Sequence, residues 1–199
     1  MRIAAGLLLG LWASAAVTAD YTYCTLCHGA NAGGNQNIAA PALKGIEPWY
    51  LTDALAAYRG SLRGNAFDKD PSGSEMHSVT RQITAAEEPE VLKFLASLPA
   101  TKATATVEGN AARGKKLYAE TCAACHGPRG QGNADLHAPN LTRLNDWYIV
   151  STFAKYRSGT RGADPVDIWA FQMHQIVGTL PADYAIADVA RYLATESRN

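Results

Sequence analysis

The chain has 199 residues, room for one large or two small domains, and 47% of them are apolar, enough for a packed core. Charged residues make up only 18%, which excludes a typical disordered chain, and 18 basic residues balance 18 acidic ones. The basic residues form no cluster, so nothing indicates a nucleic-acid-binding protein.

Residues 1–19 have the features of a bacterial export signal. Arg2 precedes an apolar stretch, and Val17-Thr18-Ala19 places small residues around a cleavage point before Asp20. We predict that residues 1–19 are a cleaved signal peptide; an uncleaved anchor is the alternative. No later segment is long and apolar enough to cross a bilayer, so we expect no transmembrane anchor after cleavage. Peripheral membrane association is compatible with this prediction.

All four cysteines lie in two C-x-x-C-H motifs. The motifs are Cys24-Thr-Leu-Cys27-His28 and Cys122-Ala-Ala-Cys125-His126. This spacing suits haem c, because two thiols can add to the two vinyl groups of one porphyrin and the adjacent imidazole can then reach the iron. We predict two covalently bound haems c, with each motif histidine as an iron ligand. The alternatives are a redox-active C-x-x-C, a zinc site or two disulfides, but no βαβ pattern supports the first.

The chain repeats itself with an offset of 98 residues. Both haem motifs fit this register, and so do several other groups: Ala40-Pro41 with Ala138-Pro139, Trp49-Tyr50 with Trp147-Tyr148, and Arg63-Gly64 with Arg161-Gly162. Met76-His77 corresponds to Met173-His174 at an offset of 97. The sequence therefore predicts a tandem duplication, with domains at residues 20–98 and 110–199. Residues 99–109, rich in small residues and Thr, read as an extended linker.

The predicted elements are helices throughout, and no strand pattern of any length occurs. Helices are expected within residues 47–60, 86–98, 110–121, 145–159 and 181–196. Pro48 suits the first turn of one of them, and Asn145 or Asp146 suits the cap of another. The counterpart of residues 110–121 would be residues 12–23, which overlap the leader. The first domain therefore has only a stub there, or it keeps the leader.

The sixth iron ligand is ambiguous from the pattern alone, because a methionine and a histidine are adjacent in both copies. Met76 and Met173 are the only methionines besides Met1. Each stands seven residues before an aliphatic residue that shortly precedes the last helix of its copy. The neighbours His77 and His174 are repeated just as faithfully, so bis-histidine ligation stays open.

Residues 20–196 resemble the dihaem class I c-type cytochromes of the cytochrome c4 family. In that family each C-x-x-C-H is followed by an A-P-x-L-like turn, an aromatic helix and a Met-bearing loop. The resemblance implies an all-α fold of two class I cytochrome c domains, related by a pseudo-twofold axis. It also implies that the carbonyls of Pro41 and Pro139 accept the proton of each ligand imidazole. Met76 and Met173 would then complete the two iron sites.

Two strong axial ligands leave no vacancy on the iron, which favours electron transfer over bond-making chemistry. The resemblance implies a periplasmic carrier, not an enzyme. It would take electrons from a quinol-oxidising complex or a dehydrogenase and pass them to a haem–copper oxidase or another periplasmic acceptor. One alternative is a tightly bound cytochrome subunit of a periplasmic dehydrogenase, such as a flavocytochrome sulfide dehydrogenase. Another is a dihaem enzyme, either a peroxidase or a thiosulfate dehydrogenase.

Several polar residues have two readings. The arginines at the ends of the aromatic helices are candidates to pair with haem propionates or to lie solvated there; they are Arg59, Arg63, Arg157 and Arg161. The repeated Trp and Tyr residues are expected to pack around the haems, not to relay electrons. His137 has no counterpart in the first copy and is predicted to be a loop residue.

Overall fold

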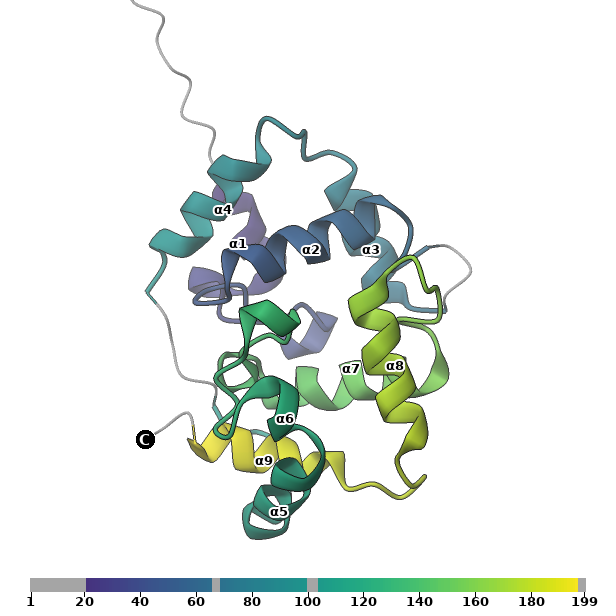
Figure 1. Cartoon of the computed structure of the whole chain (residues 1–199). Helices are drawn as coiled ribbons and strands as arrows, with labels where there is room; N and C mark the ends of the chain where they lie inside the picture. The colour runs from purple at the N-terminus through teal and green to yellow at the C-terminus, as the bar shows by residue number, and fades with distance from the viewer. Residues whose placement is uncertain (1–20, 66–68, 100–103, 197–199) are drawn as a thin grey trace, which may run out of the picture.

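The computed structural model describes residues 21–65, 69–99 and 104–196, and these form an all-helical chain in two successive halves (Figure 1). The two isolated β-bridges, Asn35 with Ala40 and Asn133 with Ala138, are the only extended pairing in these ranges. The all-α prediction is therefore confirmed. The predicted signal peptide lies outside the described residues.

Each half has its haem motif on a short helix, followed by a loop and three longer helices. In the first half these are α1 (Cys24–His28), α2 (Pro48–Arg59), α3 (Pro71–Thr80) and α4 (Glu88–Ser97). The second half has α6 (Ala123–His126), α7 (Asp146–Ser158), α8 (Ile168–Thr179) and α9 (Ile186–Glu196), and α5 (Ala111–Thr121) precedes them. Short 3-10 turns complete the halves; they are η1 (Tyr21–Tyr23), η2 (Ala30–Ala32), η3 (Gln36–Ile38), η4 (Ala134–Leu136) and η5 (Leu141–Arg143).

The helices expected from the sequence are present, and two of them begin at residues suited to a helix start. Pro48 is in the first turn of α2, where its missing N–H costs nothing. The Asn110 side chain accepts a hydrogen bond from the N–H of Arg113 and so caps α5. Asn145 has extended backbone angles at the N-cap of α7 but makes no side-chain cap bond. The last helix begins five residues later than the start of the expected segment, at Ile186.

One expectation is wrong: the two Met–His pairs do not lie on loops. Met76 and His77 are in α3, and Met173 and His174 are in α8. The Asp70 side chain accepts a hydrogen bond from Gly73 N, and Asp167 accepts one from Ala170 N, so an aspartate caps each helix. The segment Asp70-Pro71 already carries that signal, an N-cap residue followed by a proline at the first helical position.

The duplication extends to the loop after each haem motif. Gly34 N donates to His28 O at 2.7 Å, and Gly132 N donates to His126 O at 2.8 Å. Both glycines have positive φ angles, 97° and 82°, which glycine adopts at no steric cost. The two motifs are therefore followed by the same tight turn, and the same fold is built twice.

The core of the second half forms where α5 crosses α9. Gly114 of α5 lies against the backbone of Asp188, and Tyr118, Val189 and Leu193 are almost fully buried around the crossing. In the first half, the counterpart of α5 would lie almost entirely in residues outside the described ranges.

The halves meet through contacts that the repeat makes reciprocal. Glu47 Oε1 accepts from Asn140 N at 3.2 Å, and Asn145 Oδ1 accepts from Ala42 N at 2.7 Å. At the offset of 98, Glu47 corresponds to Asn145 and Ala42 to Asn140. The same pair of positions is thus joined in both directions, as a twofold relation requires. The pseudo-twofold packing of the two halves is confirmed.

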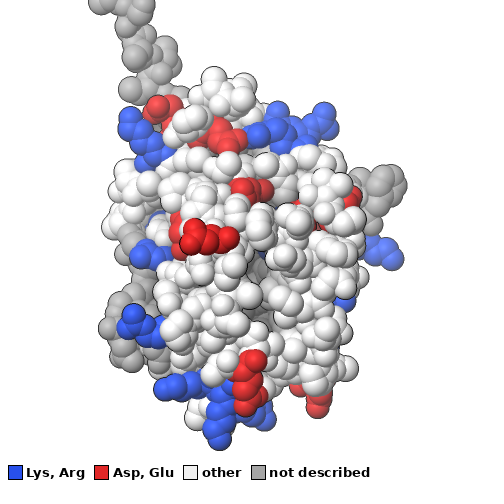
Figure 2. Space-filling view, in the orientation of Figure 1, with Lys and Arg blue, Asp and Glu red and all other residues white. Residues whose placement is uncertain are grey.

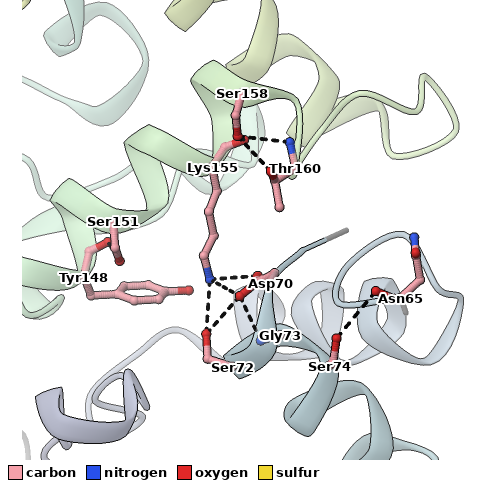
Figure 3. Close-up of polar contacts among 10 residues, drawn as sticks. All are labelled: Asn65, Asp70, Ser72, Gly73, Ser74, Tyr148, Ser151, Lys155, Ser158 and Thr160. Atoms are coloured by element: carbon pink, nitrogen blue, oxygen red, sulfur yellow. Dashed lines mark hydrogen bonds and ion pairs between the residues drawn. The ribbon is translucent and has the colours of Figure 1, made fainter. Parts of the chain in front are cut away.

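Other contacts across the interface belong to one direction only. Lys155 on α7 reaches over to α3, where its ammonium lies 2.8 Å from the Asp70 carboxylate and 3.3 Å from the Ser72 hydroxyl (Figure 3). His137 Nδ1 lies 2.9 Å from an Asp53 carboxylate oxygen. These contacts hold one half against the other beyond what the symmetry supplies.

Candidate functional site

Each half contains one large cavity, of about 190 Å³ in the first half and about 170 Å³ in the second. The predicted site residues of each copy meet at its cavity. The first is lined by Cys24, Cys27, His28, Pro41 and Met76. The second is lined by Cys122, Cys125, His126, Pro139 and Met173. Two equivalent sites therefore exist, one for each haem motif.

The geometry of the motif histidines fixes which ring nitrogen is free. His28 Nδ1 lies 2.6 Å from Pro41 O, and His126 Nδ1 lies 2.9 Å from Pro139 O. A carbonyl oxygen can only accept, so Nδ1 carries the proton and Nε2 keeps its lone pair. Burial lowers the pKa of both imidazoles, which keeps them in the neutral form that binds a metal. Both proline carbonyls lie where the resemblance implied.

The neighbouring methionine and histidine differ in what they face. Met76 and Met173 line the cavities, whereas His77 and His174 are not among the lining residues. His77 Nδ1 donates to Tyr58 O and His174 Nδ1 to Tyr156 O, each at 2.5 Å. Each of these histidines thus fastens its helix to the aromatic helix of the same half.

The cysteines are unpaired, so neither motif forms a disulfide. Cys24 and Cys122 are half-buried, and Cys27 and Cys125 are exposed. Within the described ranges, no group of three His, Cys, Asp or Glu side chains is arranged to hold a metal ion.

Two arginines are buried beside the cavities without enough partners of their own. Arg63 and Arg161 are 8% and 6% exposed, and the Nε atom of each is buried without a hydrogen-bond partner. Arg63 lines both cavities and Arg161 lines the second. A buried unpaired guanidinium is costly, and a bound carboxylate is the group that satisfies it best. The site thus fits a cofactor that brings anionic groups to this position.

The other two arginines are engaged elsewhere. Arg59 pairs with Glu88 at 2.7 Å, and Arg157 donates to Pro181 O at 2.9 Å while lying over the ring of Phe153. Tyr50 and Tyr148, in contrast, line both cavities. Burial raises the pKa of Tyr148, so its hydroxyl stays protonated at the wall between the sites. The repeated Trp-Tyr pair was a sequence signal for this shared wall, although it did not reveal that one ring serves two cavities.

A family model described as Cytochrome c matches the chain twice, over residues 15–99 and 111–197. The chain belongs to the cytochrome c family. Its two halves are tandem cytochrome c domains, and its cofactors are two covalently bound haems c. It is a dihaem electron-transfer cytochrome in fold and cofactor content.

Three similar proteins place the chain more closely. It is 27% identical over 181 residues to a thiosulfate dehydrogenase electron acceptor of Stutzerimonas stutzeri, covering 86% of this chain and 77% of that one. It is 30% identical over 158 residues to the cbb3-type cytochrome c oxidase subunit CcoP of Rhodobacter capsulatus, covering 75% of this chain. The chain spans 51% of that subunit. Cytochrome c4 of Acidithiobacillus ferrooxidans has the same fold, with a TM-score of 0.68 at 22% identity over 86% of this chain and 97% of that one.

The described helices include none that is both long enough and apolar enough to pass through a bilayer.

Proposed function

We propose that this dihaem cytochrome c is a periplasmic electron carrier, with His28 and Met76 as the axial ligands of the first haem and His126 and Met173 as those of the second. The observation that carries the proposal is that both cavities are lined by the same motif histidine and the same methionine. Two sites with the same residues are expected to carry out the same reaction, here electron transfer. An enzyme with a substrate site at one iron would need two different sites.

The bound haems would supply a one-electron Fe(III)/Fe(II) couple. The chain's part is to keep the ligands in place. The proline carbonyls hold the protons on Nδ1 and so direct Nε2 into each cavity. His77 and His174 anchor the helices that carry the methionines. Ligands held this firmly suit a group that changes charge with little rearrangement.

The shared wall supports electron exchange between the two sites within one molecule. Tyr50, Arg63, Leu144 and Tyr148 line both cavities, so these side chains form a wall that the two sites share. Arg161 Nη2 also lies 3.3 Å from the Tyr50 hydroxyl of the other half. Arginines and tyrosines here are suited to hold the anionic edges of both haems and to shield them from water.

The donor and acceptor are proposed from the relatives. One similar protein is named as the electron acceptor of a thiosulfate dehydrogenase, and another as a subunit of a cbb3-type oxidase. These names favour a periplasmic dehydrogenase as donor and a haem–copper oxidase as acceptor, and the resemblance to the cytochrome c4 family adds a quinol-oxidising complex as a second donor. The leader-like residues 1–19 support export to the periplasm.

The test is spectroscopic and kinetic. The oxidised holoprotein should show the near-infrared sulfur-to-iron charge-transfer band at an intensity equal to two methionine-ligated haems. Ascorbate should reduce both haems, and membranes containing a haem–copper oxidase should reoxidise them. Addition of peroxide should leave both spectra unchanged. A high-spin signal, or a peroxide-induced change at one haem, would defeat the carrier assignment and favour an enzyme.

The relative from Stutzerimonas stutzeri also favours a second candidate, a cytochrome subunit that stays bound to its dehydrogenase. The two roles differ in the strength of the complex. A free carrier should elute alone when the native protein is purified from its source, whereas a subunit should co-purify with a catalytic chain in constant ratio.

A further inference from the structure

The walls of the two cavities carry different charges, although the haem-binding residues match. The charged side chains that line the first cavity are Arg63, Lys155 and the exposed Glu75, and those that line the second are Arg63, Arg161, Asp53 and Asp167. On the outer face shown in Figure 2, both halves carry basic and acidic side chains, which water and salt screen. Charges in the cavity walls are screened less, so they decide how the two haem sites differ electrostatically.

The duplication places the same aspartate beside each cavity. Asp70 and Asp167 correspond at the offset of 97, and each caps the helix that carries the methionine of its half. The Asp70 carboxylate accepts a hydrogen bond from the hydroxyl of Ser72, which lines the first cavity, and Asp167 itself lines the second. A negative charge near the iron opposes the uptake of an electron. Each aspartate would therefore lower the potential of its haem unless a cation compensates it.

A lysine from the other half compensates the first aspartate but not the second. The Lys155 ammonium, carried by α7 of the second half, lies 2.8 Å from the Asp70 carboxylate. Figure 3 shows this contact beside Tyr148, a residue that lines both cavities. Among the residues that the structure describes, Asp167 has no ion-pair partner. Lys155 corresponds to Ala57 at the offset of 98, so the first half sends no equivalent lysine to the second.

We infer that Lys155 sets the reduction potential of the first haem from the opposite half of the molecule, because its ammonium cancels the charge of Asp70 at that cavity, whereas Asp167 keeps its charge at the second. The inference rests on the proposed carrier function, in which the two haems exchange electrons. Lys155 thereby shifts the distribution of an electron between the two sites toward the first haem. The size of this shift depends on the packing that brings α7 against α3.

The experiment measures the potential of each haem separately in the holoprotein. Haem methyl signals in NMR spectra are followed through a redox titration. Each signal is assigned by its nuclear Overhauser contacts with Ile83, which lines the first cavity, or Leu180, which lines the second. The variants are Lys155→Met, Asp70→Asn, the double variant of these two, and Asp167→Asn. Asparagine caps a helix as well as aspartate does, so the charge is removed while the cap is kept.

Lys155→Met leaves the Asp70 charge uncompensated. The Fe(III)/Fe(II) equilibrium of the first haem should therefore shift about tenfold toward Fe(III), which equals about 59 mV for a one-electron couple. Asp70→Asn leaves the ammonium uncompensated and should shift the same equilibrium toward Fe(II). The double variant should lie within about twofold of wild type. Asp167→Asn should shift the second haem toward Fe(II) and leave the first within about twofold of wild type.

The opposite signs separate an electrostatic role from a structural one, because looser packing of the two halves would move both single variants in the same direction. The matched control is Arg59→Met, which removes a cation of the first half that pairs with Glu88 and lines neither cavity. It should shift either equilibrium less than about twofold. Circular dichroism and visible spectra should be the same in all variants, which shows that folding and haem loading are intact.

Shifts of the same sign in Lys155→Met and Asp70→Asn would overturn the inference. Equal shifts of both haems would overturn it too, as would an Arg59→Met shift as large as that of Lys155→Met. If Lys155→Met failed to fold, Asp70→Asn and the double variant would still decide, because the inference requires the second substitution to reverse the effect of the first. The potentials are measured without a partner protein, so the carrier function is tested apart from them, by reoxidation of the wild-type protein with oxidase-containing membranes.

Discussion

At the scale of single residues, four histidines make the same kind of hydrogen bond, but only two of them line a cavity. Each donates from Nδ1 to a backbone carbonyl, those of Pro41 and Pro139 for the motif histidines and those of Tyr58 and Tyr156 for the others. The sequence could name all four as candidates but could not rank the second pair. Only the cavities separate them, because the motif histidines line them and their two rivals do not.

This difference predicts opposite effects for two adjacent substitutions. Met76→Ala should remove half of the near-infrared sulfur-to-iron band and lower the potential of the first haem, because an axial thioether favours Fe(II). His77→Ala should leave the band intact and cost only about 1 kcal/mol of stability through its lost bond to Tyr58 O. Near-infrared spectra of the oxidised variants decide the matter. Loss of the band in His77→Ala alone would make the histidine essential to the site.

Asp146 shows how one buried carboxylate holds the segment before α5 against α7. It is fully buried at the first residue of α7 and accepts bonds from Thr106 N, Thr106 Oγ1, Val107 N and Trp147 N. Burial works to raise its pKa, but the bonds from Thr106 and Val107 lower it below the ordinary value of 3.8 by a larger amount. Thr106 and Val107 are therefore fastened to the start of α7.

Asp146→Asn should destabilise the second domain by about 1–3 kcal/mol, since an amide nitrogen would face N–H and O–H donors that now meet an oxygen. The lowered pKa also sets the pH dependence. The stabilisation from Asp146 is fully present above its unfolded pKa and is lost as pH falls through the lower folded pKa. Urea unfolding at neutral pH and below pH 4 tests this, because the difference between wild type and variant should shrink in acid.

At the scale of elements, the sequence predicted those helices that have clear periodicity and caps. The loop expected for the Met–His pairs came from the resemblance to the cytochrome c4 family, in which the methionine lies on a loop. The capping aspartates Asp70 and Asp167 decide the conformation there. The shared cavity wall could not be predicted at all, since it depends on how two domains meet, and no periodicity within one domain contains that information.

The crossing of α5 and α9 depends on one glycine. A Cβ on Gly114 would lie 1.9 Å from Asp188 O, so the helices would have to separate. Gly114→Ala should destabilise the second domain by about 2–4 kcal/mol. Gly178→Ala is the matched control, because it is also helical and meets nothing within 4 Å. It should stabilise α8 by about 0.5–1 kcal/mol. If thermal melts showed a lower melting temperature for Gly178→Ala than for Gly114→Ala, the close contact of α5 with α9 at Gly114 would be contradicted.

At the scale of the whole molecule, duplication explains both the symmetry and its breaking. The reciprocal pairs of Glu47 with Asn140 and Asn145 with Ala42 follow from packing two copies of one fold about a twofold axis. Later divergence added contacts in one direction, such as Lys155 with Asp70. Two matched cavities thus sit in a molecule whose halves also make contacts that the repeat does not reciprocate.

Removing the Lys155–Asp70 ion pair tests how much a contact that is not repeated by the symmetry stabilises the packing of the two halves. Burial works to raise the pKa of Asp70, but the hydrogen bonds from Lys155 and Gly73 N lower it by more. Lys155→Met would keep the aliphatic stem and leave a carboxylate that is only 11% exposed without its cation. We expect a loss of about 1–3 kcal/mol, between the values typical of surface and buried pairs.

The matched control is Arg59→Met, which removes the more exposed pair with Glu88 inside the first domain and should cost less than about 1 kcal/mol. The variants should also differ in acid. Without Lys155 the folded pKa of Asp70 rises, so stability begins to fall at a higher pH than in wild type. Urea midpoints between pH 7 and pH 3 measure both effects. If Arg59→Met proved as costly as Lys155→Met, the strength of the interface would have to come from its reciprocal contacts alone.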